Sequence, residues 1–390
     1  MKKNWEMKRL DTVCTFINGK AYNKEELLNA GKYPVLRVGN FFTNNDWYYS
    51  DLELPEDKYC DNGDLLYAWS ASFGPRIWTG EKVIYHYHIW KVIPDSKLIT
   101  KEFLYHLLYW DVEKIKSDHG TGTTMMHVGK GSMDARVVPI PPISEQHRIV
   151  SILENAFAAI ATAKANAEQN LKNAKGLFES YLQGVFENKG EGWEEKTLGE
   201  VLRKTETIDP TKKPDYEFIY LDVSSVNKEN KEIENATVLL GKDAPSRARK
   251  LVKTNDVIFA TVRPTHSRVA LITEEYNNQV CSTGYFVLRA KEFLNNNLVF
   301  YFLLTCGFNK QMEKLQKGAS YPAVTDSEVK GIYIPYPKSL SEQQSIVQKL
   351  DALSAETKKL EAIYQQKVVD LEELKKSVLQ KAFNGELTAT

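Results

Sequence analysis

The sequence repeats itself at the scale of a whole domain. The pattern Trp-Glu-x-Lys-x-Leu begins at Trp5 and again at Trp193, 188 positions later. Ser-Glu-Gln, followed by Ile-Val and Leu, begins at Ser144 and returns at Ser341, 197 positions later. A third pair, LQGVF at 182–186 and FNGEL at 383–387, lies 201 positions apart. Because this length suits a domain rather than a solenoid unit, the chain is expected to hold two copies of one module. Two similar surfaces suit a target that itself has two parts.

Composition is that of an ordinary globular protein. The 390 residues are enough for two or three domains with cores of their own, and 42% of them are hydrophobic. The four cysteines are scattered without a Cys-x-x-Cys pair, so neither a zinc site nor a disulfide framework is indicated. No apolar run suits a membrane span or a signal peptide, and we expect a cytoplasmic protein without a membrane partner.

The charge balance argues mildly against strong non-specific binding to nucleic acid. The chain has 51 basic and 51 acidic residues, whereas phosphate binding needs clustered lysine and arginine. Between Lys242 and Arg268, however, seven basic residues stand against two acidic ones. Such a run is usually a solvated face. It nevertheless makes Arg247 and Arg249 candidate DNA contacts.

Each copy is expected to consist of a globular part of α+β character and a long helix. Module 1 comprises residues 1–143 and module 2 comprises residues 193–340. Short β-type runs bounded by turn residues predict strands at 33–38, 64–68, 82–90, 218–223, 256–260 and 284–288. Asp64 and Asp256 stand at the heads of corresponding strands. One helix is expected in each module, at 102–115 and 297–315.

Two proline-free segments predict long helices at 144–187 and 341–387, with a linker at 188–192. Their apolar or small residues follow the same heptad register, from Ile149 to Tyr181 and from Ile346 to Val378. The change of offset from 197 to 201 predicts one extra turn in the second helix. A helix of about 43 residues spans roughly 65 Å, and we expect the two to pack antiparallel with one module at each end. The alternative is two separate helices, each packed on its own module.

Two corresponding loops are candidates for contact with nucleic acid. The first is 120–130 and the second is 317–326, both rich in glycine and hydroxyl groups. Such groups suit phosphate oxygens and base edges, although a single loop of this kind is usually a solvated connector. Its recurrence with different tips suits two readers of different sequences. The candidate contacts are Thr121, Thr123, Thr124, His127 and Lys130 in the first loop, and Ser320 and Tyr321 in the second.

A second pair of loops follows the strands headed by Asp64 and Asp256. Arginine side chains there could make bidentate contacts to guanine or phosphate, or could be surface residues without such a role. The candidate contacts are Ser70, Ser72 and Arg76 in module 1, and Arg263, His266, Ser267 and Arg268 in module 2.

Catalytic and metal-binding patterns are weak. His86 and His88 alternate along an expected strand, but module 2 has Ser282 and Gly284 there, so a metal site is not expected. Pro214-Asp215 followed by Glu229-Asn230-Lys231 matches a metal-dependent nuclease pattern, whose chemistry needs both carboxylates on neighbouring strands. Glu229 lies instead in a polar turn. Phosphate-binding and glycine-rich cofactor loops are absent from the sequence.

With these motifs in view, the chain resembles the specificity (S) subunits of Type I restriction-modification systems along essentially its whole length. The most specific marks are PIPPISEQHRIV at 139–150 and IPYPKSLSEQQSIV at 334–347, which are similar to the family's opening of each long helix. GTTMMH at 122–127 and GASYPA at 318–323 look like the loops that precede them. FNGEL at 383–387 is similar to the family's C-terminal signature.

The resemblance implies two target-recognition domains joined by an antiparallel helical coiled coil with an internal pseudo-twofold repeat. Each domain would read one half of a bipartite double-stranded DNA site, and the helix pair would fix the spacer. The subunit would have no catalytic residues and no cofactor of its own. Its partners would be two methyltransferase subunits and, through them, restriction subunits, which use S-adenosylmethionine, ATP and Mg²⁺. The competing classes are the nuclease and a coiled-coil scaffold that does not contact DNA.

Overall fold

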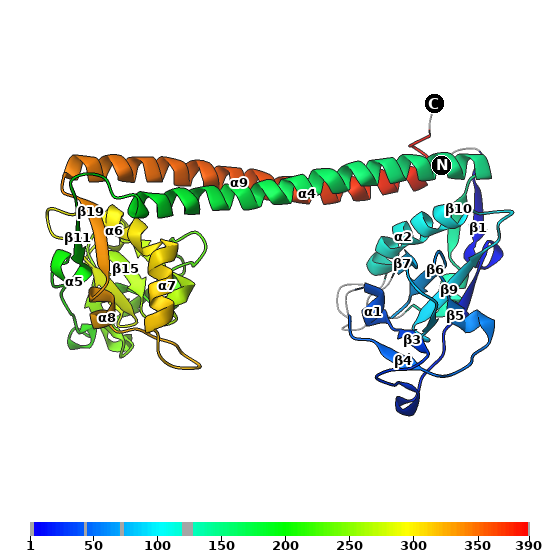
Figure 1. The fold of residues 1–390 in the computed structure, drawn as a ribbon, viewed down its shortest axis with the longest axis horizontal. Helices are drawn as coiled ribbons and strands as arrows, with labels where there is room; N and C mark the ends of the chain where they lie inside the picture. Colours follow the sequence, from blue (N-terminus) through cyan, green and yellow to red (C-terminus); the bar gives the residue numbers. More distant parts are fainter. Residues whose placement is uncertain (1–3, 43–44, 71–73, 119–127, 389–390) are drawn as a thin grey trace. The chain divides into compact units, whose positions relative to one another are not determined.

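The computed structural model describes residues 4–42, 45–70, 74–118 and 128–388. The chain divides into two compact units. Unit 1 contains residues 1–167 and 366–390, and unit 2 contains residues 168–365. Each unit therefore combines one module with part of both long helices (Figure 1). None of the helices in the described parts of the chain is long and apolar enough to cross a membrane.

Module 1 is built on two four-stranded sheets (Figure 1). One has the order β2-β9-β6-β7 and is antiparallel, and the other has the order β4-β3-β8-β5, in which β3 and β8 are parallel. A separate ladder joins the start of the module, β1, to its end, β10. The strands are β1 (Glu6–Arg9), β2 (Cys14–Asn18), β3 (Tyr33–Leu36), β4 (Tyr48–Ser50), β5 (Tyr59–Cys60), β6 (Leu65–Ala68), β7 (Gly74–Ile77), β8 (Val83–Tyr85), β9 (Ile89–Pro94) and β10 (Val137–Ile140). The helices are α1 (Val38–Phe42), α2 (Lys101–Asp118) and α3 (Lys130–Asp134).

Module 2 repeats this topology with one strand fewer in its second sheet. Its four-stranded sheet has the order β13-β12-β17-β14 with β12 and β17 parallel, its second sheet has the order β16-β15-β18, and β11 pairs with β19. The strands are β11 (Trp193–Thr197), β12 (Glu217–Leu221), β13 (Thr237–Leu240), β14 (Ala248–Leu251), β15 (Val257–Ala260), β16 (Val269–Leu271), β17 (Val280–Ser282), β18 (Tyr285–Leu288) and β19 (Tyr333–Pro337). The helices are α5 (Leu198–Val201), α6 (Asn296–Leu303), α7 (Cys306–Leu315) and α8 (Asp326–Lys330). The α+β character and the duplication expected from the sequence are thus confirmed.

Two expected elements are each broken in two. Residues 82–90 form not one strand but β8 and β9, with a turn at 86–88, because the chain passes from one sheet to the other there. Residues 297–315 form α6 and α7 rather than one helix. The first ends with Leu304 as its C-cap, and Thr305 starts the second, since its side chain caps α7 by accepting a hydrogen bond from the backbone N–H of Phe308.

The long helices are α4 (Ile143–Glu187) and α9 (Leu340–Phe383), of 45 and 44 residues. The expected extra turn in the second helix is wrong. Gly184 is helical, whereas Gly385 lies beyond the end of α9 with a φ of 79°. The left-handed glycine ends the helix, and the N–H of Glu386 reaches back to the carbonyl of Lys381. Phe186 and Phe383, both buried, are the true counterparts and keep the offset of 197.

The expected heptad stripe is buried over part of each helix. In α4 its buried members extend from Ile149 to Ala174, with Asn170 exposed among them, and Leu177 and Tyr181 beyond them are exposed. In α9 it is right as far as Thr357, after which Leu360 and Leu374 are exposed. A straight helix has 3.6 residues per turn, so a 3.5-residue repeat drifts by one position over a helix of this length. The buried line moves to the next residue along.

Buried glutamines fasten each module to the helices. Gln146, in α4, and Gln343, in α9, are fully buried. The Gln146 side chain accepts a hydrogen bond from the N–H of Thr100 (2.8 Å) and donates to the carbonyls of Leu98 (2.8 Å) and Pro141 (2.9 Å). Gln343 makes the same three kinds of bond with residues of module 2. The repeated Ser-Glu-Gln motif thus attaches the start of each long helix to the module before it.

A second pair of glutamines attaches the helix ends. Gln380 of α9 accepts a hydrogen bond from the indole N–H of Trp110 in module 1 (2.9 Å). Its counterpart, Gln183 of α4, accepts from the N–H of Gly307 in module 2 (3.2 Å). In each unit, therefore, the beginning of one long helix and the end of the other hold the same module. Within unit 1, α4 and α9 are also linked directly by Lys164 and Glu372, 2.5 Å apart.

One buried histidine in unit 1 makes stability depend on pH. His106 of α2 packs against Phe157 of α4, and its Nδ1 is buried without a hydrogen-bond partner among the described residues. Burial, with a smaller contribution from Lys375, lowers the pKa of His106 to about 4. Because the unfolded chain titrates near the ordinary value of 6.5 and so binds the proton more strongly, stability falls as the pH drops from 6.5 towards 4.

Replacing His106 with phenylalanine is therefore expected to raise the free energy of unfolding at neutral pH by about 1–2 kcal/mol, because it removes an unpaired buried polar atom. The change should also flatten the loss of stability between pH 6.5 and 4. Thermal unfolding across this range measures both effects, with the exposed His147→Phe as the control. A variant whose stability falls with acid as steeply as the wild type would contradict this role.

Candidate nucleic-acid interface

Three segments meet at one end of module 1. They are the residues after β6, the turn after β8 and the residues before α3. The N–H of Trp69 donates to the carbonyl of His88 (3.1 Å), and the N–H of Val128 donates to the carbonyl of Trp69 (3.1 Å). These two backbone bonds fix the segments side by side without using any side chain.

The same frame recurs in module 2 with different residues. The N–H of Thr261 donates to the carbonyl of Gly284 (2.9 Å), and the N–H of Val324 donates to the carbonyl of Thr261 (2.9 Å). Thr261 therefore corresponds to Trp69, and each lies five residues after its aspartate, Asp256 or Asp64, as the predicted pairing of those aspartates requires. Since the bonds involve backbone alone, the side chains at these tips are free to differ between the modules.

The tip of module 2 presents an arginine stacked on a tyrosine. Arg263 has a left-handed φ of 50°, and its N–H donates to the carbonyl of Pro322 (2.7 Å). Its guanidinium carbon lies 5.0 Å from the centre of the Tyr321 ring. Tyr321 is 72% exposed, the highest value among the exposed large hydrophobic residues of the described chain. The structure thus brings together two candidates from different loops, as a planar cation over an exposed ring.

The other candidates in module 2 fall into two groups. Ser320, His266 and Arg247 are exposed. The remaining side chains have partners within the module. Arg249 lies 3.5 Å from Asp209, the hydroxyl of Ser267 accepts a hydrogen bond from Asn309 (2.6 Å), and the guanidinium of Arg268 donates to the carbonyl of Val226. Arg268 therefore has a structural role, holding the segment after β12 in place.

Two of the three described candidate DNA contacts in module 1 are buried or bonded within the module. Ser70 is buried, and the guanidinium of Arg76 donates to the carbonyl of Phe41. Lys130 is exposed at the first position of α3. The candidates Ser72, Thr121, Thr123, Thr124 and His127 lie outside the described residues.

Sequence reasoning missed an aromatic cluster at the tip of module 1. The His86 ring lies 4.9 Å from that of His88, which in turn lies 4.9 Å from that of Trp69 and 3.9 Å from that of Tyr87. The indole N–H of Trp69 donates to the carbonyl of Tyr87 (2.8 Å). Burial, with a smaller contribution from His88, lowers the pKa of His86 to about 4, so this ring is neutral at pH 7. The signal was the run HYHIW, which was interpreted as part of one strand.

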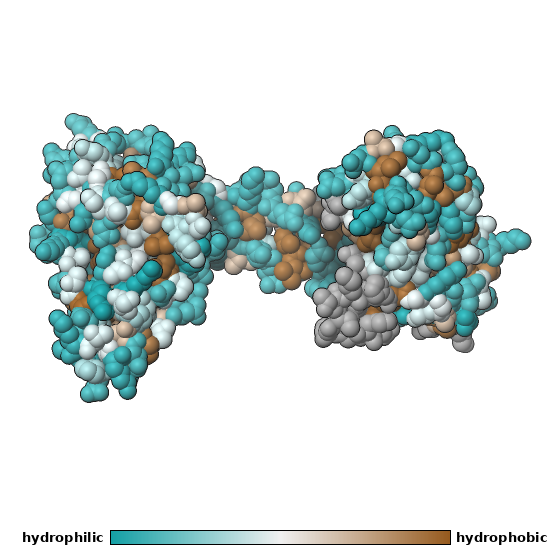
Figure 2. Space-filling model, turned by 90° about the horizontal axis from the view of Figure 1, so that it is seen from below, coloured by the Kyte–Doolittle hydropathy of each residue, from teal (hydrophilic) through white to brown (hydrophobic). Residues whose placement is uncertain are grey.

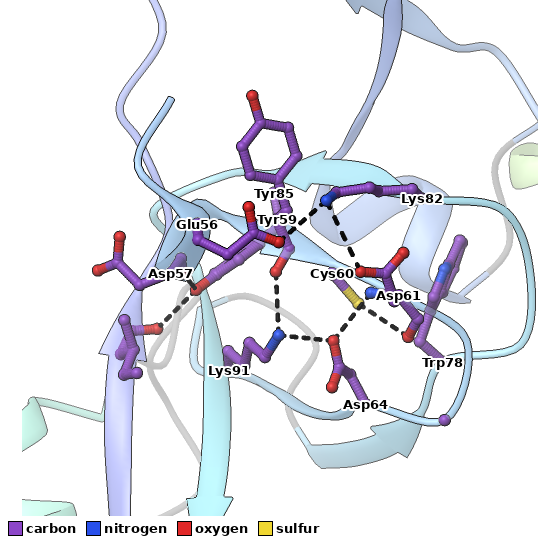
Figure 3. Close-up of polar contacts among 12 residues, drawn as sticks. Glu56, Asp57, Tyr59, Cys60, Asp61, Asp64, Trp78, Lys82, Tyr85 and Lys91 are labelled. Atoms are coloured by element: carbon purple, nitrogen blue, oxygen red, sulfur yellow. Dashed lines mark hydrogen bonds and ion pairs between the residues drawn. The ribbon is translucent and has the colours of Figure 1, made fainter. Parts of the chain in front are cut away.

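The polar cluster at the other end of β6 is structural (Figure 3). Asp64 accepts a hydrogen bond from the N–H of Asp61 (2.8 Å) and lies 2.7 Å from the Nζ of Lys91 on β9. Lys91 also donates to the carbonyl of Tyr59 (3.1 Å). The cluster joins the two sheets of module 1 at the head of β6.

Module 2 repeats this cluster. Asp256 accepts from the N–H of Lys253 (2.8 Å) and from both Nε and Nη2 of Arg289 (2.7 Å each). Hydrogen bonds from Lys253 and Arg289 also lower the pKa of Glu206 to about 2. The correspondence of Asp64 with Asp256 is thus confirmed, and the recurrence explains both carboxylates as fold residues.

The nuclease pattern does not assemble. Asp215 precedes β12, and Glu229 lies in a separate exposed turn 3.6 Å from Lys228, so neither carboxylate is in a strand. The ammonium of Lys231 donates to the carbonyl of Ser267 (2.8 Å). Over the part of the chain that the structure describes, no cluster of three or more His, Cys, Asp or Glu could hold a metal ion.

Comparison with known proteins agrees with this architecture. A family model described as "Type I restriction modification DNA specificity domain" matches residues 2–173 and 190–368, once for each copy. The chain is similar to the MjaVIII specificity subunit of Methanocaldococcus jannaschii (24% identical, 99% of this chain, 93% of the relative) and to the EcoBI specificity subunit of Escherichia coli (20% identical, 99% and 87%). A chain from a solved type I restriction-modification assembly has the same fold, with a TM-score of 0.76 at 19% identity over 99% of both chains.

Proposed function

This chain belongs to the Type I restriction-modification DNA specificity family and is a DNA-recognition subunit, and we propose that each of its modules reads one half of a bipartite DNA site. The observation that carries the proposal is the repeated tip. Two modules of the same topology hold three segments with the same pair of backbone hydrogen bonds, yet present different side chains. Two modules with a common backbone and different side chains suit a site with two different half-sequences. Contacts to bases specify the sequence, whereas contacts to phosphates only position the protein on the DNA.

We propose that Arg263, Tyr321, His266, Ser320 and Arg247 form the contact surface of module 2. Arginine donates in a bidentate manner to guanine, and an exposed tyrosine offers both a ring and a hydroxyl. The frame leaves their side chains at the surface while the backbone of Arg263 is tied to Pro322. In module 1 we include Lys130 and the exposed part of the aromatic cluster.

We propose that the two long helices form an antiparallel coiled coil that sets the spacer between half-sites. The attachment glutamines support this proposal. Gln146 and Gln183 in α4 are 37 positions apart, and so are Gln343 and Gln380 in α9, which corresponds to roughly 55 Å of helix. Equal distances between the attachment glutamines in the two helices suit a pseudo-twofold arrangement. Half-sites that are read from one face of DNA lie one helical turn, about 34–36 Å, or a multiple of it apart.

We further propose that the helices dock the methyltransferase subunits. Both helices carry exposed apolar side chains, among them Leu177, Ile363, Val369 and Leu374. Figure 2 shows brown surface on the stretch of helix that is visible in that view. On this proposal these side chains contribute to a contiguous apolar surface that a partner covers. On this proposal catalysis belongs to the partner subunits, which use S-adenosylmethionine, ATP and Mg²⁺ and recruit the restriction subunits in turn. The complex would act in the cytoplasm.

Replacing Arg263 with alanine tests the reading role. We expect binding to weaken by roughly 5- to 150-fold through one half-site, with relaxed preference at the base pair that the arginine contacts. Equilibrium binding of the complex with its methyltransferase subunits, on duplexes altered in either half, measures the effect. Arg268→Lys, at a residue with a structural role, is the matched control and should leave base preference unchanged. Equal loss at both halves, or none, would contradict base reading by Arg263.

A further inference from the structure

A hollow of about 180 Å³ lies at the tip of module 1, beside the shared frame. Its polar lining residues come from the start of α1, the segment before β4 and the turn after β8, and are Arg37, Asn40, Asp46, His86 and His88. The sequence motifs had assigned none of these residues to DNA. The hollow sits beside Trp69, whose N–H bonds the carbonyl of His88.

Strand pairing creates the hollow. The parallel strands β3 and β8 place Leu36 opposite Tyr85, so the next residue of each, Arg37 and His86, emerge together at the end of the sheet. The N–H of His86 donates to the carbonyl of Leu36 (2.9 Å). Arg37 is exposed, with its guanidinium carbon 5.2 Å from the centre of the Tyr48 ring.

The far wall is held by α1. The side-chain amide of Asn40 donates to the backbone carbonyl of Asp46 (2.8 Å), which ties the helix to the exposed segment before β4. The hollow therefore combines a cationic donor, a carboxylate residue and two histidines.

In module 2 a valine side chain occupies the corresponding place. There β12 and β17 place Leu221 opposite Cys281, so Gly284 corresponds to His88. A Cβ at Gly284 would come within 2.5 Å of the Cγ2 of Val223. Val223 thus closes the place that the histidines open in module 1, and the two copies differ here in shape as well as in charge.

We propose that this hollow is the base-reading pocket of module 1 and that it takes the major-groove edge of a G·C base pair. This inference rests on the proposed function of the tips as DNA readers. Arginine donates to the O6 and N7 acceptors of guanine, and a carboxylate accepts from the N4 amino group of cytosine. Arg37 supplies the donor, and Asp46 belongs to the lining of the same hollow. An A·T pair instead presents a donor between two acceptors and a methyl group, which this pair of residues matches less well.

The test uses the complex of the full chain with its methyltransferase subunits and duplexes carrying its methylated site. Each base pair of both half-sites is replaced in turn, and Arg263→Ala identifies which half belongs to module 2. In the other half, Arg37→Ala is expected to erase the preference for one G·C pair, reducing discrimination there by roughly 5- to 150-fold. Arg37→Lys should erase most of it too, because lysine lacks the bidentate fork. Lys97→Ala, at an exposed residue outside the hollow, is the matched control.

The proposal is overturned if Arg37→Ala and Arg37→Lys retain every base preference of the wild type, or weaken all base pairs equally. It is also overturned if the preference that they erase is for an A·T pair. If Arg263→Ala still changes the base preference in its own half-site, only the proposal for the hollow is wrong. If Arg263→Ala also changes no base preference, the proposed reading role of both tips is wrong. Thermal unfolding of the Arg37 variants confirms that the exposed substitution leaves unit 1 folded.

Discussion

Replacing Gln343 with leucine is expected to lower the free energy of unfolding by about 3–5 kcal/mol. The side chain is fully buried and satisfies three backbone groups: it donates to the carbonyls of Phe293 (2.9 Å) and Pro337 (2.8 Å) and accepts from the N–H of Asn295 (2.7 Å). Leucine has a similar volume but leaves all three groups unpaired, at about 1–3 kcal/mol each. Gln146→Leu should have the same effect on unit 1. Denaturant unfolding followed by circular dichroism measures the loss.

An exposed glutamine on the same helix supplies the control. Gln366 bonds only the neighbouring side chain of Asp370 among the described contacts, and Gln366→Leu should change stability by no more than about 0.5 kcal/mol. If Gln343→Leu were as mild as Gln366→Leu, the glutamine would not be an attachment point between helix and module.

Shortening both long helices by seven residues is expected to shorten the preferred DNA spacer or to abolish bipartite binding. Residues 161–167 and 358–364 are equivalent by the 197-residue offset and lie midway between the attachment glutamines. Seven residues are close to two turns, so the buried face is nearly kept while the helix loses about 10.5 Å. That length corresponds to about three base pairs of DNA. Selection of bound sequences from random duplexes measures the spacer directly.

A length-preserving variant controls for the altered sequence. Exchanging the two seven-residue segments between α4 and α9 changes the same positions and leaves both helices at their natural length. It should retain the original spacer. A shortened protein that folds, binds two half-sites and keeps the natural spacer would show that the helices do not set the spacer length.

The repeat in the sequence was sufficient to predict the duplicated α+β modules, because whole-domain duplication preserves strand order even where side chains differ. It also identified the correspondence of Asp64 with Asp256. The two broken elements could not be foreseen. A run such as HYHIW has strand character throughout, and the turn within it arises because β8 and β9 belong to different sheets.

The details of the helices depended on geometry that a heptad pattern does not contain. The match of 182–186 with 383–387 aligned Gly184 with Gly385, but one is helical and the other ends its helix. For the tips, the motifs indicated the loops but not which arginines are engaged within the module. Arg268 and Arg263 lie in the same loop, yet only tertiary contacts distinguish the one that bonds a carbonyl from the one that stacks on an exposed tyrosine.

Two DNA-reading modules held at a fixed separation are tested most directly by the DNA sequence that is methylated in a host carrying the complete system. We expect two short specified segments separated by a spacer of fixed length and unspecified sequence, with Arg263→Ala altering one segment only. A single continuous recognition sequence, or two segments whose separation varies from site to site, would contradict this arrangement.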